Sequence, residues 1–292
     1  MKIITSSEIN AWLSCPKRWW FRYDQLLVPG LTPKPLAFGR LVHDMLEDYY
    51  LWCSGWAKNQ LPIRDHQDNI DEFDEETAKS IIFAYKERDP VKALGHEIID
   101  IESEFCIPLR SPTGRKYHYV ELAGKIDLTT QDEYGNIWVW DHKTSASNLD
   151  HSWLAISNQM GYYVWANWQL GAAPVGIIYN LIRKPSIKPR INETPTEWGV
   201  RLAADIESRP EFYFQRENIP KSPNDLLSLE NELWDVAHAV GRGPKIRNPN
   251  GCSIYGCAYR ELCVNDTKLS RQTGYRIERA HIELKEETLC QQ

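Results

Sequence analysis

The sequence has no visible secretion signal, no internal repeat and no excess of positive charge, and each absence narrows what the protein can be. Its first eight residues contain neither an apolar core nor a small-residue cleavage site, so we expect a cytosolic protein. Lys and Arg total 34 against 40 Asp and Glu, a net charge of -6, which predicts no overall attraction to nucleic acid or to an anionic membrane. A polyanionic partner would therefore have to be held by a local basic patch or through metal ions.

We also expect no disulfide framework, because seven cysteines are an odd number and the chain has no visible secretion signal. Metal binding or free thiols are the alternatives. Hydrophobic residues make up 42% and charged residues 25% of the 292 residues, which excludes disordered and collagen-like chains. This length allows one large domain or two small ones, with a sizeable core.

The longest run without Asp, Glu, Lys or Arg, residues 151–182, is long enough to be compared with a transmembrane helix. Several Asn and Gln side chains interrupt its apolar content, and Gly171-Ala-Ala-Pro174 divides it. We therefore expect a helix at about 152–170, then a buried strand at about 175–182, and no membrane segment.

Hydrophobic spacing predicts helices first, then mainly strands, then a further helix. The first helix is expected from near residue 7, with an interruption around Pro16, and the second over 38–52. A third is expected to follow a polar stretch at 59–76 and to end near 89–90, and a fourth is expected over 224–240. Strands are expected over 98–109, 117–129, 137–143 and 211–216, the second and third forming an antiparallel hairpin. The order predicts an α/β fold with one central mixed sheet flanked by helices. We expect a single domain with a helical part (1–95), a sheet core (96–220) and a helical, cysteine-bearing part (221–292).

Two acids and a lysine are predicted to converge at the hairpin. Asp141 and Lys143 are two apart on one strand and project to the same face, and the hairpin can bring Asp127 beside them. Two carboxylates and a backbone carbonyl, that of His142, would make an incomplete oxygen shell suited to Mg²⁺ or Mn²⁺. A lysine beside such an ion can orient or help to deprotonate an attacking water, as phosphodiester hydrolysis requires.

The alternative is an ordinary salt bridge, because an isolated Asp-x-Lys pattern is more often a paired strand end. The residues before Asp141, Val139 and Trp140, are apolar, so this acid enters the fold where an unpaired charge would be costly. The second acid on the adjoining strand also favours a functional site.

In these residues and their order the chain resembles the PD-(D/E)xK nuclease superfamily, specifically its RecB-like branch. That branch includes the CRISPR-associated adaptation nucleases with an iron-sulfur cluster and the AddB nuclease domain. The resemblance covers most of the chain. It rests on motifs in the family's order: Ser14-Cys15-Pro16-Lys-Arg-Trp-Trp-Phe21, Phe38-Gly39-Arg-Leu-Val-His43, Gly124-Lys-Ile-Asp127, Asp141-His-Lys143, Gln159-Met-Gly-Tyr-Tyr163 and the C-terminal cysteines.

The resemblance implies a restriction-endonuclease-like sheet and assigns roles to individual residues. It makes Asp127 and Asp141 metal ligands, Lys143 the catalytic lysine and His43 a further metal ligand on a helix. Many relatives have Glu where Asp141 stands, and either acid can ligate a metal. The resemblance also implies that Gln159 and Tyr163, which share a helix face, lie by the site and contact DNA or the metal-bound network.

Other residues near these motifs have two readings. Without the family context, His43 would be an ordinary core or surface histidine, and Tyr163 could serve helix-sheet packing. Reserve carboxylates are Glu47, Glu102 and Glu104, although alternation on an exposed strand explains the last two. Basic patches that are either phosphate contacts or solvated loop charge lie at Lys17-Arg18, 183–190 and 242–247, with Trp19 and Trp20 as stacking or buried rings.

Three cysteines cluster near the C-terminal end with the spacing C-x4-C-x5-C, at Cys252, Cys257 and Cys263. The spacing permits three thiolates around one metal centre. The resemblance names Cys15 as the fourth ligand and implies a 4Fe-4S cluster, with zinc as the alternative; relatives usually show C-x2-C-x5-C. Such a centre would join the N- and C-terminal segments and close most of the chain into one loop. The other three are expected to be a helix residue, a strand residue and a tail thiol: Cys53, Cys106 and Cys290.

The resemblance implies a divalent-metal-dependent DNA exonuclease, rather than an endonuclease, acting on single strands or DNA ends. Recombination, repair, phage replication or CRISPR adaptation would be its setting, in the cytosol of a bacterium, an archaeon or a phage-infected host. Its partners would be DNA and recombination or adaptation proteins. A non-catalytic nucleic-acid-binding or scaffold subunit with the same fold is the alternative, against which stands the complete set of acids and lysine. A zinc-stabilised domain unrelated to nucleases is a third.

Overall fold

The secondary structure of this protein, taken from a computed structural model, is described for residues 2–56, 69–111, 113–252, 256–264, 274–282 and 284. The chain divides into two compact units. We call Met1–Leu31, Glu104–Lys125 and Pro223–Gln292 the terminal unit, and Thr32–Ser103 and Ile126–Ser222 the central unit. That the whole chain acts as one domain stays a prediction.

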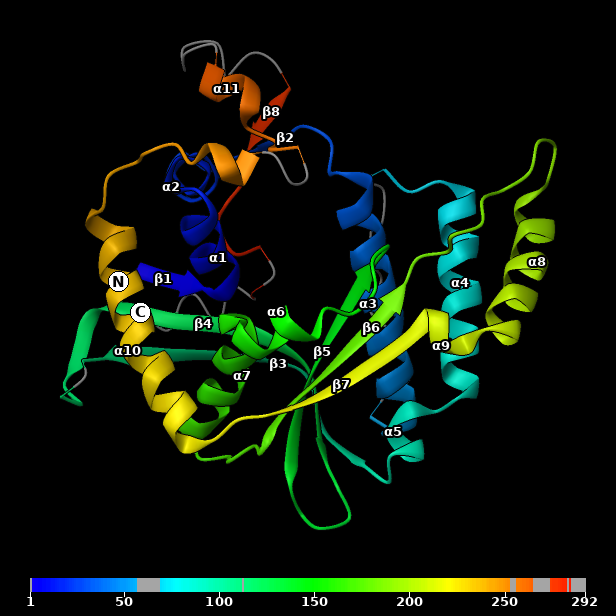
Figure 1. The fold of residues 1–292 in the computed structure, drawn as a ribbon, viewed down its shortest axis with the longest axis horizontal. Coiled ribbons are helices and arrows are strands. Elements are labelled where there is room, and N and C mark those ends of the chain that lie inside the picture. The colour runs from blue at the N-terminus through cyan, green and yellow to red at the C-terminus, as the bar shows by residue number, and fades with distance from the viewer. Residues whose placement is uncertain are drawn as a thin grey trace. The chain divides into compact units, whose positions relative to one another are not determined.

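The sheet is mixed, as the sequence predicted, and helices flank it (Figure 1). Its strand order is β1-β4-β5-β6-β7, with β3 paired to β4. β1 runs parallel to β4 and β5 parallel to β6, whereas the β4/β5 and β6/β7 pairs are antiparallel. The strands are β1 Lys2–Thr5, β3 Glu97–Arg110, β4 Lys116–Gln131, β5 Ile137–Ser145, β6 Gly176–Arg183 and β7 Phe214–Pro220.

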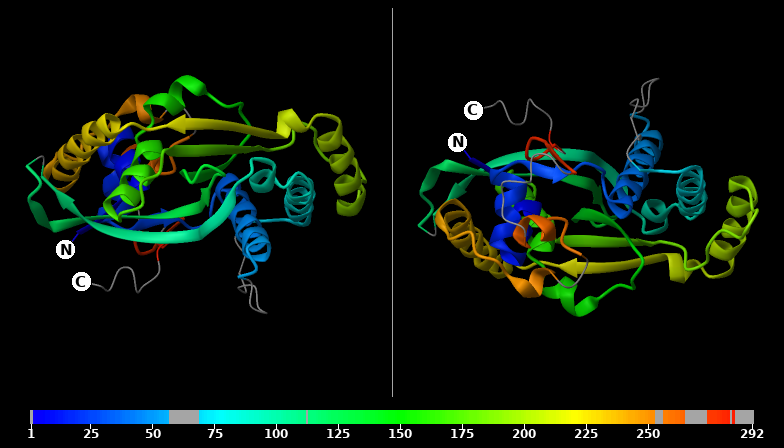
Figure 2. Two further views of the ribbon diagram at one scale, coloured as in Figure 1. Left: turned by 90° about the horizontal axis from the view of Figure 1, so that it is seen from below. Right: turned by 90° about the horizontal axis from the view of Figure 1, so that it is seen from above.

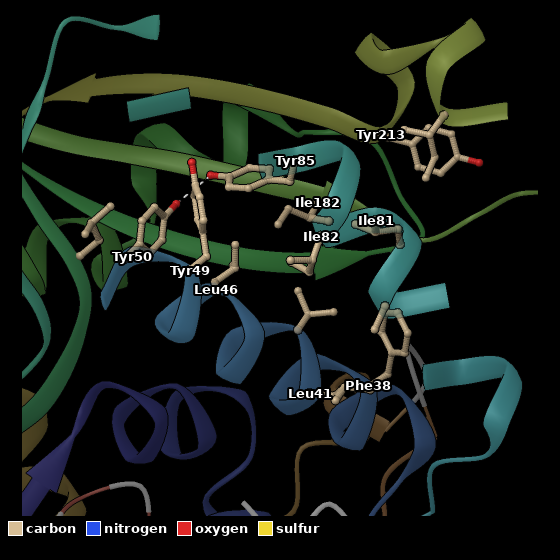
Figure 3. Close-up of a cluster of buried hydrophobic side chains, with 14 of the residues drawn as sticks. Phe38, Leu41, Leu46, Tyr49, Tyr50, Ile81, Ile82, Tyr85, Ile182 and Tyr213 are labelled. Carbon is tan, nitrogen blue, oxygen red and sulfur yellow. Dashed lines mark hydrogen bonds between the residues drawn. The ribbon is translucent and has the colours of Figure 1, made fainter. Parts of the chain in front are cut away.

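In the central unit, three helices lie side by side in the order α3, α4, α8 (Figures 1 and 2). The helices of this unit are α3 Lys34–Cys53, α4 Glu72–Glu87, α5 Pro90–Ala93, α6 His151–Ile156, α7 Asn158–Gln169, α8 Pro195–Ser208 and α9 Pro210–Tyr213. Figure 3 shows part of the core that α3 and α4 form with β6, including Leu46, Ile82 and Ile182. Burying each such side chain contributes about 1.5–3 kcal/mol, which anchors these elements around the sheet.

The terminal unit contains α1 Ser6–Ser14, α2 Pro16–Trp19, a π-helical turn Trp20–Asp24, α10 Pro223–Arg242, a 3-10 turn Pro249–Cys252, α11 Arg260–Val264, and the antiparallel pair β2 Leu27–Pro29 with β8 Tyr275–Ile277. Phe21, Leu27, Tyr259 and Leu262 form a small buried cluster in it. Segments from the two ends of the sequence therefore pack together within this unit.

Most predicted elements are present, and the differences have local causes. The helix expected at 152–170 is two helices, because the backbone is extended at Ser157. The strand expected at 211–216 begins only at Phe214, because a helical turn starting at Pro210 precedes it. Strand β1 and helix α8 were not predicted from the sequence. Much of the polar stretch at 59–76 lies outside the described residues. Among all the helices that the structure describes, none is both long and apolar enough to cross a membrane.

Candidate active site

The candidate site lies in the central unit, where strands β4 and β5 separate. Leu128 and Trp140 are the last paired residues at this end of the β4/β5 ladder, and Asp127 and Asp141 follow. The backbone N–H of His142 donates to Asp127 Oδ2 at 2.7 Å. One carboxylate thus replaces the missing strand partner, and the two acids meet at the opening of the sheet.

Asp141 forms a polar cluster with the lysine two residues later and with a side chain from α7. Lys143 Nζ donates to Asp141 Oδ1 at 2.9 Å, and Gln159 Nε2 donates to the same oxygen at 3.2 Å. Tyr163 lies one turn after Gln159 and is close enough to act on the pKa of Lys143. The structure therefore brings together Asp141, Lys143, Gln159 and Tyr163; strand parity predicted the first pair on one face and helix spacing the second, whereas only the family resemblance implied that the two pairs meet.

The electrostatics of this cluster are those of a site short of positive charge. Burial, reinforced by Asp127, raises the pKa of Asp141 despite the nearby Lys143. Burial disfavours the cationic form of Lys143, but Asp141, Tyr163 and Asp127 outweigh it and raise its pKa. Burial also disfavours the ionised form of Asp127, yet His43, Lys143 and His142 together lower its pKa. Lys143 is thus a cation, and it lies near two acidic side chains, those of Asp141 and Asp127.

Asp141 is 1% exposed, and its Oδ2 atom is buried and has no hydrogen-bond partner in the part of the chain that the structure describes. An unpaired buried carboxylate oxygen costs free energy, and a bound cation would remove that cost.

Helix α3 brings His43 to the same place. A Cβ on Gly39 would lie 3.3 Å from Thr144 Oγ1, so glycine allows the helix to lie close to the end of β5. His43 is four residues later on the same helix face. Its Nδ1 atom is 3.7 Å from Asp127 Oδ1.

Glu102 of β3 completes a set that sequence reasoning kept only in reserve. Ligand atoms of His43, Glu102 and Asp127 all lie within 4.8 Å of one another. Glu102 has a φ of 51°, a left-handed conformation that is rare for a non-glycine residue in a strand. Because this conformation breaks strand alternation, residue parity could not have predicted where its side chain lies. Glu47 and Glu104 are not in this set.

His142 points to the other face of β5, as alternation requires. Its ring stacks on Tyr50 of α3 with 5.5 Å between centroids. Burial lowers the pKa of His142 to about 3 against the opposing charge of Asp127, so its imidazole is neutral. Its backbone N–H faces Asp127, and because N–H and C=O of one strand residue point to the same side, its carbonyl faces the opening as well.

The cysteines predicted to hold a metal centre all lie in the terminal unit. Burial raises the pKa of Cys263, and Cys257, Cys15 and Cys252 act on it in the same direction, so the four thiols are neighbours. Among the described residues, however, these four form no set of three with sulfurs within 4.8 Å of one another. Cys53 ends α3 and Cys106 lies in β3, whereas Cys290 lies outside the described residues.

The basic patches are partly used by the fold itself. Lys17 Nζ lies 3.7 Å from the centroid of the Trp20 ring, and Trp19 is buried. The Arg183 guanidinium donates to Asn148 and Ala146, so it orders the loop after β5. These contacts explain part of the basic charge without nucleic acid.

Comparison with known proteins gives one family and a weak structural likeness. The family model described as the PD-(D/E)XK nuclease superfamily matches residues 4–264. No curated protein matches the chain. Among solved structures, the crystal structure of SSO0001 is 14% identical, with 84% of this chain and 79% of that chain covered and a TM-score of 0.32, a value too low to carry an argument.

Proposed function

This chain belongs to the PD-(D/E)XK nuclease superfamily, and from that premise we propose that it is a divalent-metal-dependent DNA nuclease of the RecB-like branch. The observation that carries the proposal is the buried Oδ2 atom of Asp141, which has no hydrogen-bond partner among the described residues and lies next to Lys143 and a second acid at the opening of the sheet. Structural stability alone gives no reason to bury such an atom.

The donor set fits a hard divalent cation. Asp127 and Asp141 offer carboxylate oxygens, His142 its backbone carbonyl and His43 an imidazole, and we add Glu102 to these proposed ligands. Mg²⁺ and Mn²⁺ favour such oxygen-rich sites and keep open positions for water and phosphate. When bound, the cation would polarise the scissile phosphate and make a water more nucleophilic.

The side chains around these ligands would position the reacting groups. Lys143, a cation held by Asp141, would stabilise negative charge developing on the phosphate. Gln159 would fix the orientation of Asp141 through its hydrogen bond, and Tyr163 would border the same space from α7. Lys143 and Gln159 both bond Oδ1, which leaves Oδ2 for the cation.

We further propose an exonuclease that acts on single strands or DNA ends, in recombination, repair, phage replication or CRISPR adaptation. The ordered motifs shared with the RecB-like branch support this finer assignment. They also support a 4Fe-4S cluster, or less favourably zinc, on Cys15, Cys252, Cys257 and Cys263. The effect of the other three thiols on the pKa of Cys263 supports such a centre.

The test is cleavage of 5'- and 3'-labelled single- and double-stranded DNA with Mg²⁺ or Mn²⁺. We expect Lys143→Ala and Asp141→Asn to lose about 10²–10³-fold in rate while thermal unfolding stays cooperative. Lys79→Ala, which removes an exposed lysine of α4 and its ion pairs with Glu75 and Glu76, is the matched control and should cleave normally. Release of mononucleotides from one labelled end would support an exonuclease, whereas internal fragments would indicate an endonuclease.

The alternative, a binding or scaffold subunit, predicts a different result. Such a protein would bind DNA with either ion and cut none of the four substrates, and Lys143→Ala would change nothing in the cleavage assay. For the cysteine centre, a brown protein absorbing near 400 nm, a wavelength typical of this cluster type, indicates iron-sulfur, and a colourless protein with stoichiometric zinc indicates the other occupant.

A further inference from the structure

A tyrosine of β6 lies directly beside the acid and the lysine of the candidate site. In the parallel β5/β6 ladder Tyr179 is paired with Asp141, and β6 is the strand between β5 and β7 (Figure 1). Side chains at paired positions of neighbouring strands project to the same face of a sheet. Tyr179 therefore shares a face with Asp141 and with Lys143, which is two residues after Asp141. All three residues lie in the central unit.

The strand order places Tyr179 on the side of the site opposite to most of the proposed cation ligands. Asp127 is on β4 and Asp141 on β5, whereas Tyr179 is on β6, one strand beyond Asp141. The charges around the hydroxyl agree with this position. Burial raises the pKa of Tyr179 to about 12; Asp141 adds to the rise and Lys143 opposes it. Asp127 acts on the pKa of Tyr163 of α7 in addition to these two, but not on that of Tyr179.

The hydroxyl of Tyr179 makes no hydrogen bond to any residue that the structure describes. The hydroxyl of Tyr163, by contrast, is engaged by Gln159. Tyr179 is partly exposed, and the side chain of Lys143 is 35% exposed, whereas that of Asp141 is 1% exposed. The cluster is therefore open to solvent at Lys143 and Tyr179. A phenol in this position can donate a hydrogen bond to a ligand without giving up a partner in the protein.

The next residue of the same row, on β7, does not take up the hydroxyl. Glu217 is paired with Tyr179 in the antiparallel β6/β7 ladder. Its Oε2 atom lies 3.2 Å from His151 Nδ1. Among the described residues, the charges that act on the pKa of Tyr179 are those of Asp141 and Lys143, and Glu217 is not one of them. The hydroxyl therefore lies toward β5, and the carboxylate of Glu217 is engaged by His151.

We propose that the Tyr179 hydroxyl donates a hydrogen bond to the DNA phosphate next to the scissile one, where the substrate strand crosses β6. This inference rests on the proposed function, since it concerns the same substrate strand. The cation and Lys143 would hold the scissile phosphate, and the donor on β6 is one strand farther from the cation than Asp141 is. It therefore meets the following phosphate of the strand. A contact of this kind positions the strand without reading its sequence.

The experiment removes the donor and the proposed acceptor separately and then together. Single-stranded oligonucleotides carry one methylphosphonate linkage, in which a methyl group replaces a charged phosphate oxygen. Cleavage at the two linkages directly beside it is mapped on gels with Mg²⁺ or Mn²⁺. On unmodified DNA we expect Tyr179→Phe to lower kcat/KM about tenfold, because a hydrogen bond to a charged group is lost. Most of this loss should be a higher KM, because the contact is to a phosphate that does not react.

The methylphosphonate should matter less to the variant than to the wild-type protein. At one of the two flanking linkages we expect it to slow wild-type cleavage about tenfold, and to slow Tyr179→Phe about fivefold less than that, because the donor is already missing. A purely structural role of the hydroxyl would leave the methylphosphonate penalty equal in both proteins. Since the hydroxyl has no partner among the described residues, the unfolding temperature of Tyr179→Phe should equal that of wild type.

The matched control is Tyr134→Phe, which removes the same atom from the turn at the far end of the β4/β5 hairpin. Tyr134 is 81% exposed, and its printed contact to Asp132 is made by its backbone N–H. This variant should cleave unmodified DNA as the wild-type protein does and should show the full methylphosphonate penalty.

The outcomes separate this proposal from the proposed function. If Tyr179→Phe cuts unmodified DNA as well as wild type does, or if the methylphosphonate penalty is equal in both proteins at both flanking linkages, the phosphate contact is wrong while the nuclease proposal stands. If the wild-type protein cuts no DNA with either ion, the proposed function fails, and the contact fails with it. A smaller penalty in Tyr179→Phe at one flanking linkage supports the contact, and the side on which it occurs identifies the neighbour, 5' or 3', that crosses β6.

Discussion

Two groups of candidate metal ligands can be compared within this molecule, one in each unit. In the central unit the ligands lie on β3, β4, β5 and the long helix α3. Two of their carboxylates are already held by hydrogen bonds: Asp127 accepts from the backbone N–H of His142, and Asp141 accepts from Lys143 and Gln159. In the terminal unit the cysteines lie at or near the ends of short helical turns, and burial together with neighbouring thiols raises the pKa of Cys263.

The difference indicates which site is formed by the fold alone and which site forms only when a metal binds. Carboxylates on strands are held by the sheet, and the core beneath them is independent of metal. Thiols must lose their protons to bind a metal, and among the described residues the hydrophobic cluster next to Cys257 and Cys263 contains four buried residues. We therefore expect the central site to be preformed and the terminal cysteine segment to depend on its centre.

The largest expected effect is that of Cys15→Ser, which removes the proposed fourth ligand of the centre. Structural zinc contributes about 10–16 kcal/mol of apparent binding free energy in small peptides, so loss of a ligand should unfold the local structure. Hydrogen exchange measured by mass spectrometry should show loss of protection in α2 and α11, with β5 and α7 unchanged. Cys53→Ser, at the exposed end of α3, is the control and should leave exchange as in wild type. Equal loss of protection in both units would contradict the comparison.

The sequence predicts the residues that local strand geometry places, but not those whose position depends on unusual backbone conformation or on distant contacts. Strand parity placed Asp141 and Lys143 on one face, and hairpin geometry brought Asp127 beside them. Parity could not place Glu102, because a left-handed residue changes the side to which a strand side chain points. Nor could it predict the hydrogen bond between the His142 ring and Asn180, because these residues are 38 apart along the chain.

The elements that were missed show the same division. Helix α8 was detectable, because Thr194 and Glu197 form a capping box with Pro195 at the first helical position. β1 has four residues and is stabilised by pairing with β4, a contact between residues 118 apart in the chain, as in Lys2 with Val120. Local patterns therefore sufficed for capped helices and long strands, but not for what is formed by distant pairing.

A smaller effect is expected from Glu102→Gln, which tests whether Glu102 is one of the metal ligands of the preformed site. Loss of one carboxylate ligand should raise the dissociation constant for Mn²⁺ about tenfold, roughly 1.4 kcal/mol, with little change in unfolding temperature. Glu104→Gln is the matched control, since this residue is two positions away on the same strand and outside the ligand set. Calorimetric titration of the metal-free proteins makes the measurement. Equal Mn²⁺ affinity in both variants would remove Glu102 from the site.

The smallest expected effect concerns the turn that holds β4 and β5 in register at the far end of the hairpin. Asp132 accepts hydrogen bonds from the backbone of Tyr134 and Asn136 and from the side chains of Asn136 and Trp138. Although desolvation opposes it, these bonds lower the pKa of Asp132 to about 2.

Because the folded pKa is below the unfolded value of about 3.9, Asp132 stabilises the fold above pH 4, and this contribution is lost as pH falls through 2. Asp132→Asn keeps an acceptor for the backbone donors but places an NH₂ group toward Trp138. We expect the variant to be less stable at pH 7 and its unfolding free energy to fall less steeply than that of wild type between about pH 4 and 2. Urea unfolding at several pH values makes the comparison. Parallel curves for the two proteins would mean that the turn, and the strand register it supports, is held by the backbone alone.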